Sequence, residues 1–260
     1  MLTQLREVYR YREAIRNIVA RDLKVRYSSS ALGVIWSLFS PLLMTLVYSL
    51  VFTVLVPSAI EKFPVFILAG LLPWNFFLGS VLAATGIITG NGHLINRVYF
   101  PREILPISSI LSNGVNFAIA LLLLFAAILL FQVRLSATVL WAPVLIAIQL
   151  VFTLGLALFL SAVNVFFRDT HPIVDILMLA WFFLTPIIYP IEFIQDATLQ
   201  LLVQALNPLA ALIVSYRHVF YYGDIPNLSL MAVTAAEAGL MLLVGSIVFR
   251  RLSPAFAEEV

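Results

Sequence analysis

The sequence predicts an all-α integral membrane protein with six transmembrane helices, forming one transmembrane domain over residues 1–260. Hydrophobic residues make up 62% of the chain and charged residues 11%, whereas a soluble domain has about 45–50% apolar and about 25% charged residues. The apolar residues form long continuous runs, unlike the alternating segments of about ten residues in a membrane β-barrel. Most Lys and Arg residues stand at alternate ends of these runs, which is the pattern of a multi-pass helical protein.

Composition also argues against several site chemistries. The chain has no cysteine, so it can form neither a disulfide nor a thiolate metal site. His93, His171 and His218 are far apart in sequence and lack the spacing of zinc ligands, so we expect no metal site. The pI near 9 does not predict nucleic-acid binding, because the basic residues lie beside hydrophobic spans.

Six apolar segments are each close to the ~20 residues needed to cross ~30 Å of hydrocarbon. Residues 1–28, before the first of them, place apolar side chains at three- and four-residue steps between arginines. This pattern predicts an amphipathic helix in the membrane interface, which serves as a membrane anchor or also braces a partner. The predicted spans are 31–56, 64–88, 108–131, 138–167, 173–189 and 230–249.

The distribution of basic residues predicts that both chain ends are cytoplasmic. With this orientation only Lys62, Arg134 and Arg217, of the 15 Lys and Arg residues, fall on outer segments. The positive-inside rule therefore favours this topology.

Residues 190–229 contain two apolar runs that are each too short to span. Asn207-Pro208 separates them, and Asn before Pro is a helix-start signal. Apolar runs of about 10–14 residues are typical of re-entrant or interfacial segments. We therefore predict a helical hairpin that enters the membrane from the outer face and returns.

The chain lacks a phosphate-binding loop. Such a loop needs Gly-Lys followed by Ser or Thr, and the two lysines follow Leu23 and Glu61. The chain therefore has no ATPase site of its own, and ATP-driven transport would need another subunit.

Short motifs spread in order over nearly the whole chain resemble those of one family: the permease subunits of type-2 ATP-binding-cassette exporters for O-antigen, capsule and teichoic acid. Ser28-Ser29 and Ser40 depart from the family pattern, which limits any inference about the glycan carried. The motifs are Lys24-Val25-Arg26-Tyr27, Ser30, Leu32-Gly33, Trp36, Pro41, Phe100-Pro101-Arg102-Glu103-Ile104-Leu105-Pro106, Phe167-Arg168-Asp169, Thr185-Pro186-Ile187-Ile188-Tyr189-Pro190 and Asn207-Pro208-Leu209.

The resemblance implies a homodimer in the bacterial cytoplasmic membrane with two nucleotide-binding subunits. ATP and Mg would be bound by those subunits and a lipid-linked polysaccharide would be transported, with no covalent chemistry and no cofactor on this chain. It also implies a cytoplasmic coupling helix, expected at 91–106, and two outer gate helices, expected within 190–229.

Four groups of residues are candidates for these roles, each with a plainer alternative. The coupling segment could be an ordinary positive-inside loop, and the aromatic side chains of the path could serve packing or interfacial belts. A carboxylate within a span is costly and is expected to be functional or paired. The groups are Asn96, Arg97, Val98, Tyr99, Phe100, Arg102 and Glu103 for coupling; Tyr48, Phe52, Trp181, Phe182 and Tyr189 for a translocation path; Glu192, Asn207, Pro208, Tyr216 and Arg217 for the outer gate; and Glu237 as an intramembrane polar site.

Three other functions compete with polysaccharide export. A permease for drugs or small lipids belongs to the same superfamily, but the outer hairpin and the Phe-Pro-Arg-Glu run favour a glycan. A membrane glycan-processing enzyme would need clustered carboxylates or histidines, and here these residues are scattered. A secondary transporter would show inverted repeats and paired broken spans, which the sequence lacks.

Overall fold

The structure is a computed structural model and describes residues 10–28, 35–52, 60–95 and 100–260. All regular elements in these ranges are helical, as the sequence predicts. The longer helices are α2 Arg12–Ser28, α3 Ile35–Leu50, α4 Phe63–Thr85, α7 Ile104–Leu130, α8 Ala142–Phe166, α9 Thr170–Leu184, α10 Ala197–Leu206, α11 Pro208–Arg217 and α12 Leu228–Leu252. The short ones are α5 Ile87–Gly90, α6 Gly92–Ile95 and α13 Phe256–Glu259.

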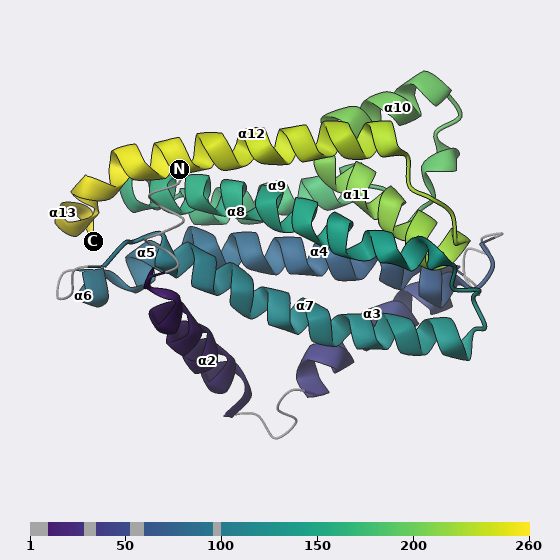
Figure 1. The fold of residues 1–260 in the computed structure, drawn as a ribbon, viewed down its shortest axis with the longest axis horizontal. Helices are drawn as coiled ribbons and strands as arrows, with labels where there is room; N and C mark the ends of the chain where they lie inside the picture. The colour runs from purple at the N-terminus through teal and green to yellow at the C-terminus, as the bar shows by residue number, and fades with distance from the viewer. Residues whose placement is uncertain (1–9, 29–34, 53–59, 96–99) are drawn as a thin grey trace.

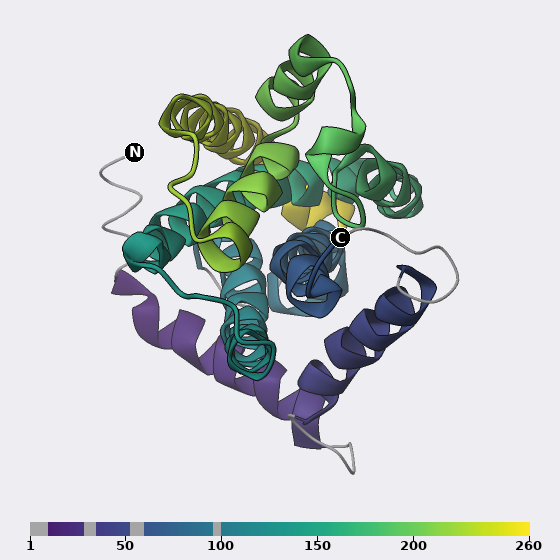
Figure 2. The ribbon, with the colours of Figure 1, turned by 90° about the vertical axis from the view of Figure 1, so that its right-hand side faces the viewer.

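Helix α4 lies at the centre of the bundle, and α3, α7, α8, α9 and α11 pack against it (Figure 2). Its sequence is apolar on all sides and its residues are buried on all sides, as expected for a core helix. Pro64 stands in its first turn, where a missing N–H costs nothing. The helix therefore forms the scaffold against which the outer elements are placed.

The pair α8 and α12 runs side by side over much of its length (Figure 1). Gly155 of α8 and Gly245 of α12 meet where the backbones cross, and a Cβ atom at Gly245 would overlap the Gly155 carbonyl oxygen. Glycine at both positions permits this approach. A Cβ atom at Gly239, by contrast, would meet no heavy atom of the described residues within 4 Å.

Four helical segments among the described residues are long and apolar enough to cross a membrane: Phe63–Thr85, Ile104–Leu130, Ala137–Phe166 and Leu228–Glu259. Helices α10 and α11 pass the same test only as a pair, and they are bent by 111° at their junction. The described apolar parts of the first and fifth predicted spans, Leu38–Leu50 and Thr170–Leu184, are shorter. These segments make the chain a multi-pass membrane protein.

Prolines explain two differences from the predicted boundaries. The third span begins at Ile104 rather than at 108, because Pro106 falls in the first turn, where its missing N–H is tolerated. The helix at the fifth predicted span ends at Leu184 rather than at 189. Thr185 precedes Pro186 and has an extended backbone with ψ 132°, the conformation that a following proline favours.

The predicted coupling helix over 91–106 is not continuous. Gly92–Ile95 form one helical turn, residues 96–99 lie outside the described residues, and Phe100–Glu103 are not helical. The remaining residues already belong to α7. Pro101 disfavours helical backbone at the residue before it, which accounts for the break.

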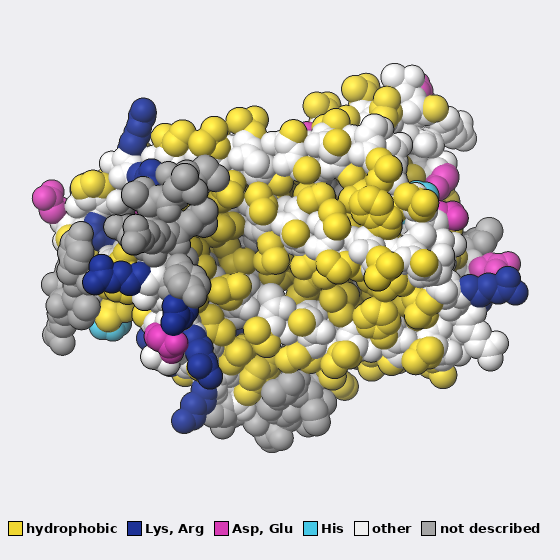
Figure 3. All heavy atoms as spheres, viewed as in Figure 1, with side chains coloured by type: hydrophobic (Ala, Val, Ile, Leu, Met, Phe, Trp, Pro, Cys, Tyr) yellow, Lys and Arg dark blue, Asp and Glu magenta, His cyan; other side chains and the backbone are white. Residues whose placement is uncertain are grey.

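The face of the molecule in Figure 3 has an apolar middle and charged ends. Lys and Arg side chains gather toward the end where the C-terminus lies, and a smaller charged group marks the opposite end (Figures 1 and 3). Many large apolar side chains are exposed, including Leu122, Leu179 and Leu240. Such a band is expected where lipid is the solvent.

Candidate functional site

The site begins with the bent pair of helices at the end of the bundle away from the C-terminus (Figure 1). Asn207 caps α11 by accepting hydrogen bonds from the backbone N–H groups of Leu209 and Ala210, at 3.1 and 3.3 Å. Pro208 follows at the first helical position, the arrangement that Asn-Pro predicts. Asp196 caps α10 through the N–H groups of Thr198 and Leu199. Two short helices thus meet at Asn207-Pro208, where the chain bends by 111°.

Asn207 also ties the junction of the two helices to α9. Its Oδ1 accepts a hydrogen bond from the Trp181 indole N–H at 2.9 Å. Its Nδ2 donates to the hydroxyl of Thr185 at 3.0 Å, and Thr185 is fully buried. The junction is therefore anchored to the end of α9 by the same side chain that starts α11.

Arg217 ends α11 and is only 2% exposed. Its guanidinium donates to the carbonyl oxygens of Phe66, Pro186 and Tyr189 at 3.4, 2.6 and 3.0 Å, and also to that of Ile187. The guanidinium carbon lies 3.6 Å from the centre of the Phe66 ring, a cation–π contact.

The partners of Arg217 are carbonyl dipoles rather than a carboxylate. Neither of the ion pairs seen in the described residues, both within α2, includes it. A buried guanidinium needs all its donors satisfied, and here the chain after α9 wraps around it. Arg217 therefore fixes α11 to both α4 and the segment that follows α9.

Tyr216 extends this polar network into the core. Its hydroxyl donates to Gln149 Oε1 of α8 at 2.9 Å. Gln149 Nε2 in turn donates to the Pro73 carbonyl oxygen of α4 at 2.8 Å. Tyr216 and Gln149 are both fully buried. Gln149 was not predicted as a site residue, although a lone Gln in an apolar span signals a hydrogen-bonded pair.

The predicted gate residues thus fall into two groups. Asn207, Pro208, Tyr216 and Arg217 belong to the anchored half of the hairpin, whereas Glu192 is exposed in the connection before α10. Every residue of α11 except one is buried, and none of α10 is. Within this pair of helices, α11 is packed into the core and α10 is not.

Four of the five predicted path residues meet around α4. Tyr48, Phe52, Trp181 and Phe182 are half-buried and pack against the same apolar cluster. Phe52 stacks on Phe63, with ring centres 5.3 Å apart. Tyr189 lies apart from them, and its hydroxyl donates to the Phe183 carbonyl oxygen.

Two of these rings make further aromatic contacts. Trp181 meets Phe77 edge-on at 5.4 Å, and Phe182 meets Trp74 in the same way at 5.6 Å. These aromatic contacts pack both side chains against the core within a single chain. Part of each of the four path side chains remains exposed.

At the opposite end, the coupling residues are only partly described. Asn96, Arg97, Val98 and Tyr99 lie outside the described residues. Arg102 lies over the ring of Phe256, with its guanidinium carbon 5.8 Å from the ring centre, and Phe100 packs against the same cluster. Glu103 begins α7 without a side-chain cap.

Three contacts in this half were not predicted. Phe256 of α13 is fully buried, so the end of the chain packs against the loop before α7. Arg26 of the Lys-Val-Arg-Tyr motif donates to Asn113 Oδ1 of α7 at 3.2 Å, and the Tyr27 hydroxyl donates to Asn116. The sequence did hold signals for these contacts. Phe256 is a single aromatic residue close to the C-terminus, and Asn113 and Asn116 are polar residues within an apolar span.

Glu237 lies on α12 and is half-buried. Its Oε2 atom is buried without a hydrogen-bond partner among the described residues. The same part of the chain holds no group of three or more His, Cys, Asp or Glu side chains that could bind a metal ion. The polar side chains that the structure does bring together are those of the buried network around Arg217, Tyr216 and Gln149.

A multi-pass helical scaffold of this kind is typical of transporter membrane subunits, and comparison with known proteins gives the family. The profile of the family "ABC-2 type transporter" matches residues 13–221. The chain therefore belongs to the ABC-2 type transporter family.

Three relatives show how far the similarity extends. The O-antigen export system permease protein RfbA of Myxococcus xanthus is 38% identical over 260 residues, covering the whole of both chains. The protein of the same name from Klebsiella pneumoniae is 31% identical over 93% of this chain and 92% of its own. The polysialic acid transport protein KpsM of Escherichia coli is 21% identical over 68% of this chain and 70% of its own.

Proposed function

We propose that this chain is the permease subunit of an ATP-binding-cassette exporter that moves a lipid-linked polysaccharide of the O-antigen type across the bacterial cytoplasmic membrane. The observation that carries the proposal is the 38% identity to an O-antigen export permease over the full length of both chains. A match of this extent includes the outer hairpin as well as the spans, so it covers the segments that the mechanism uses.

The working unit is a homodimer with two nucleotide-binding subunits. The chain has no Gly-Lys-Ser/Thr phosphate loop, so ATP and Mg are bound by the partner subunits, where hydrolysis takes place. ATP-driven closure reaches the membrane through the cytoplasmic segment 91–106, against which Phe256 packs. The two permeases then part and the glycan passes between them.

The proposed topology has six crossings with both ends inside. The successive helices α4, α7, α8 and α9 alternate in direction along the bundle, and the C-terminus lies at the end richer in basic side chains (Figures 1 and 3). The hairpin of α10 and α11 begins and ends on the outer side. Its contribution to gating comes from α10 and Glu192, because α11 is held in the core.

Deletion and complementation test the function. Loss of the gene should remove long-chain glycan from the cell surface and leave lipid-linked glycan inside, and the chain should restore export only together with its ATPase subunit. Normal surface glycan in the deletion strain would contradict the proposal. Loss of resistance to a small drug without any change in glycan would favour the drug or small-lipid alternative.

Two further measurements test the partner and the topology. The purified chain, verified free of other subunits, should show no ATPase activity. Cysteines introduced at Glu192, Asp196 and Asp224 should react with an impermeant thiol reagent from outside intact spheroplasts, since the chain has no cysteine of its own. Labelling only from the inside would contradict the topology.

A further inference from the structure

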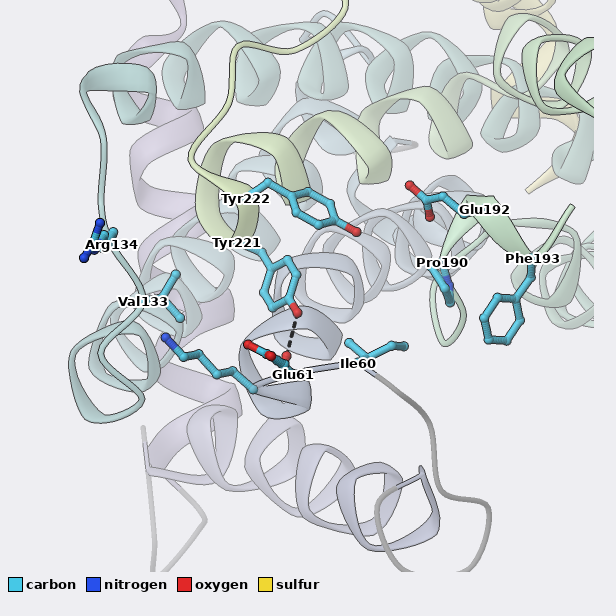
Figure 4. Close-up of a pocket in the computed structure, with 10 residues that line it drawn as sticks. Ile60, Glu61, Val133, Arg134, Pro190, Glu192, Phe193, Tyr221 and Tyr222 are labelled. Carbon is cyan, nitrogen blue, oxygen red and sulfur yellow. Dashed lines mark hydrogen bonds between the residues drawn. The ribbon is translucent and has the colours of Figure 1, made fainter. Parts of the chain in front are cut away.

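A pocket of about 590 Å³ opens at the end of the bundle away from the C-terminus (Figure 4). Four segments that are far apart in sequence form its walls: residues 60–62 just before α4, the connection from α7 to α8, residues 190–193, and the end of the helical turn His218–Tyr222. Its volume lies within the roughly 300–1,000 Å³ of small-molecule sites.

The walls combine aromatic rings with charged groups. Tyr221, Tyr222 and Phe193 contribute rings, and Glu192 and Arg134 contribute charges. Tyr222 and Glu192 point toward each other across the opening (Figure 4). In the described part of the chain neither Glu192 nor Arg134 forms an ion pair, so both remain available to a ligand.

The backbone around this pocket adopts unusual conformations. Lys62 and Gln132 are the non-glycine residues with positive φ among those described, at 50° and 51°. The Lys62 ammonium donates to the Gln132 carbonyl oxygen at 2.9 Å, which joins the two segments. Such conformations are unfavourable for side chains and cluster at ligand sites.

The turn His218–Tyr222 adds a further irregularity. It is a π-helix that ends at Gly223, with φ 77°, and π-turns are frequent at functional sites. The turn presents Tyr221 and Tyr222 in succession, and the Tyr221 hydroxyl donates to the Glu61 carbonyl oxygen at 2.5 Å. The aromatic wall is therefore held in place before any ligand binds.

We propose that this pocket binds a short segment of a carbohydrate chain at the outer mouth of the transporter, an inference that rests on the proposed export of a polysaccharide. The rings of Tyr222 and Phe193 suit the apolar faces of sugar rings. The carboxylate of Glu192 accepts hydrogen bonds from neighbouring hydroxyls, and Arg134 donates to sugar oxygens.

The balance of charge selects the ligand class. Glu61 and Glu192 offset Lys62 and Arg134, and the Lys62 ammonium is already bonded to a carbonyl oxygen. A phosphate or an anionic lipid headgroup would meet as many carboxylates as cations among the lining residues, so their charges offer it no net attraction. An uncharged, hydroxyl-rich glycan fits these groups better.

The test uses the permease–ATPase complex in nanodiscs of zwitterionic lipid. The probe is the glycan released by mild acid from the host's lipopolysaccharide and labelled with a fluorophore at its reducing end. Fluorescence anisotropy should show about fivefold to tenfold weaker binding for Tyr222→Ala and about tenfold weaker binding for Glu192→Gln. Tyr222→Phe should bind like the wild type, because it keeps the ring.

Asp224→Asn is the matched control, because it converts another exposed outer carboxylate to an amide outside the pocket. Equal affinity for the wild type, Tyr222→Ala and Glu192→Gln would overturn the inference. Displacement of the probe by phosphatidylglycerol or inorganic phosphate would also overturn it, in favour of an anion site. Either result, in a complex whose wild type restores surface glycan to the deletion strain, removes the pocket and leaves the proposed export intact.

Discussion

Helices α10 and α11 have the same length and start in the same way, yet only one of them belongs to the core. Each has 10 residues and a side-chain cap, from Asp196 and from Asn207. Leu201 and Leu206 of α10 are 53% and 78% exposed, whereas Leu209 of α11 is fully buried. Apolar composition and length therefore do not decide which half of the hairpin is buried.

The difference comes from a few polar contacts and from shape. Arg217 and Tyr216 bind carbonyl and amide groups of α4, α8 and the segment after α9, whereas α10 makes few contacts with the rest of the bundle. Gly70 of α4 allows α11 to approach, because a Cβ atom there would lie 3.2 Å from both Arg217 Nη2 and Ile213 Cγ2. Any gating movement of the hairpin is then expected in α10.

Removal of the Arg217 side chain should have the largest effect. Arg217→Ala leaves carbonyl groups of Phe66, Pro186, Ile187 and Tyr189 without their donor, and removes a ring contact. We expect a loss of about 3–5 kcal/mol of stability, measured as a large fall in the thermal unfolding midpoint of the purified chain in detergent.

A second arginine provides the control for that experiment. Arg134→Ala changes an exposed arginine at the same end of the molecule and should alter stability by less than about 0.5 kcal/mol. Equal unfolding midpoints for Arg217→Ala and the wild type would show that α11 is not anchored as described.

Equivalent apolar truncations in the two helices should differ strongly. Ile213 is fully buried and Leu202 is 48% exposed. Ile213→Ala should cost about 2–5 kcal/mol, because it leaves a cavity in the core, whereas Leu202→Ala should cost less than about 0.5 kcal/mol in the isolated chain. The measurement is again the unfolding midpoint.

The two helix caps give a smaller contrast. Asn207→Ala removes a cap and the bonds to Trp181 and Thr185, so we expect a loss of about 1–3 kcal/mol. Asp196→Ala removes a cap on an exposed helix and should cost less. Asn207→Asp should fall between them, since aspartate keeps the cap but cannot donate to Thr185. Equal losses of stability for Asn207→Ala and Asp196→Ala would contradict the conclusion that α11 is anchored in the core and α10 is not.

The hairpin shows what could be predicted from the sequence. Two runs too short to span, joined by Asn-Pro, were enough to predict two short helices and their junction. The burial of α11 was not predictable, because it depends on Gln149, Pro186 and Phe66, which are distant in sequence. Tyr216 and Arg217 were predicted as gate residues from the sequence, but only the fold identifies the oxygen atoms to which they donate hydrogen bonds.

The other half of the molecule shows the same limit. The apolar lengths of α4, α7, α8 and α12 follow from composition alone. The early end of α9 follows from Thr185-Pro186, because a residue before proline disfavours helical backbone. The apolar run continues past this point, so hydropathy alone did not predict the end of the helix. The packing of Phe256 against the loop before α7 and the contact of Arg26 with Asn113 join segments that no periodicity relates.

The smallest expected effect is a pH dependence confined to α10. Hydrogen bonds from the backbone N–H groups of Leu199 and Thr198 lower the pKa of the Asp196 carboxyl below its usual value of 3.8. A lowered pKa in the folded state means that the cap stabilises α10 fully above pH 3.8 and that this contribution is lost as the pH falls through the folded-state pKa. The cap of α11 is Asn207, which does not titrate, so α11 should not respond.

A spin label on Leu201→Cys should therefore become more mobile as the pH falls below 3.8, while a label on Val214→Cys should not. Asp196→Asn keeps a good cap and should abolish the response of the first label; a response that persists in this variant would assign the pH dependence to another group.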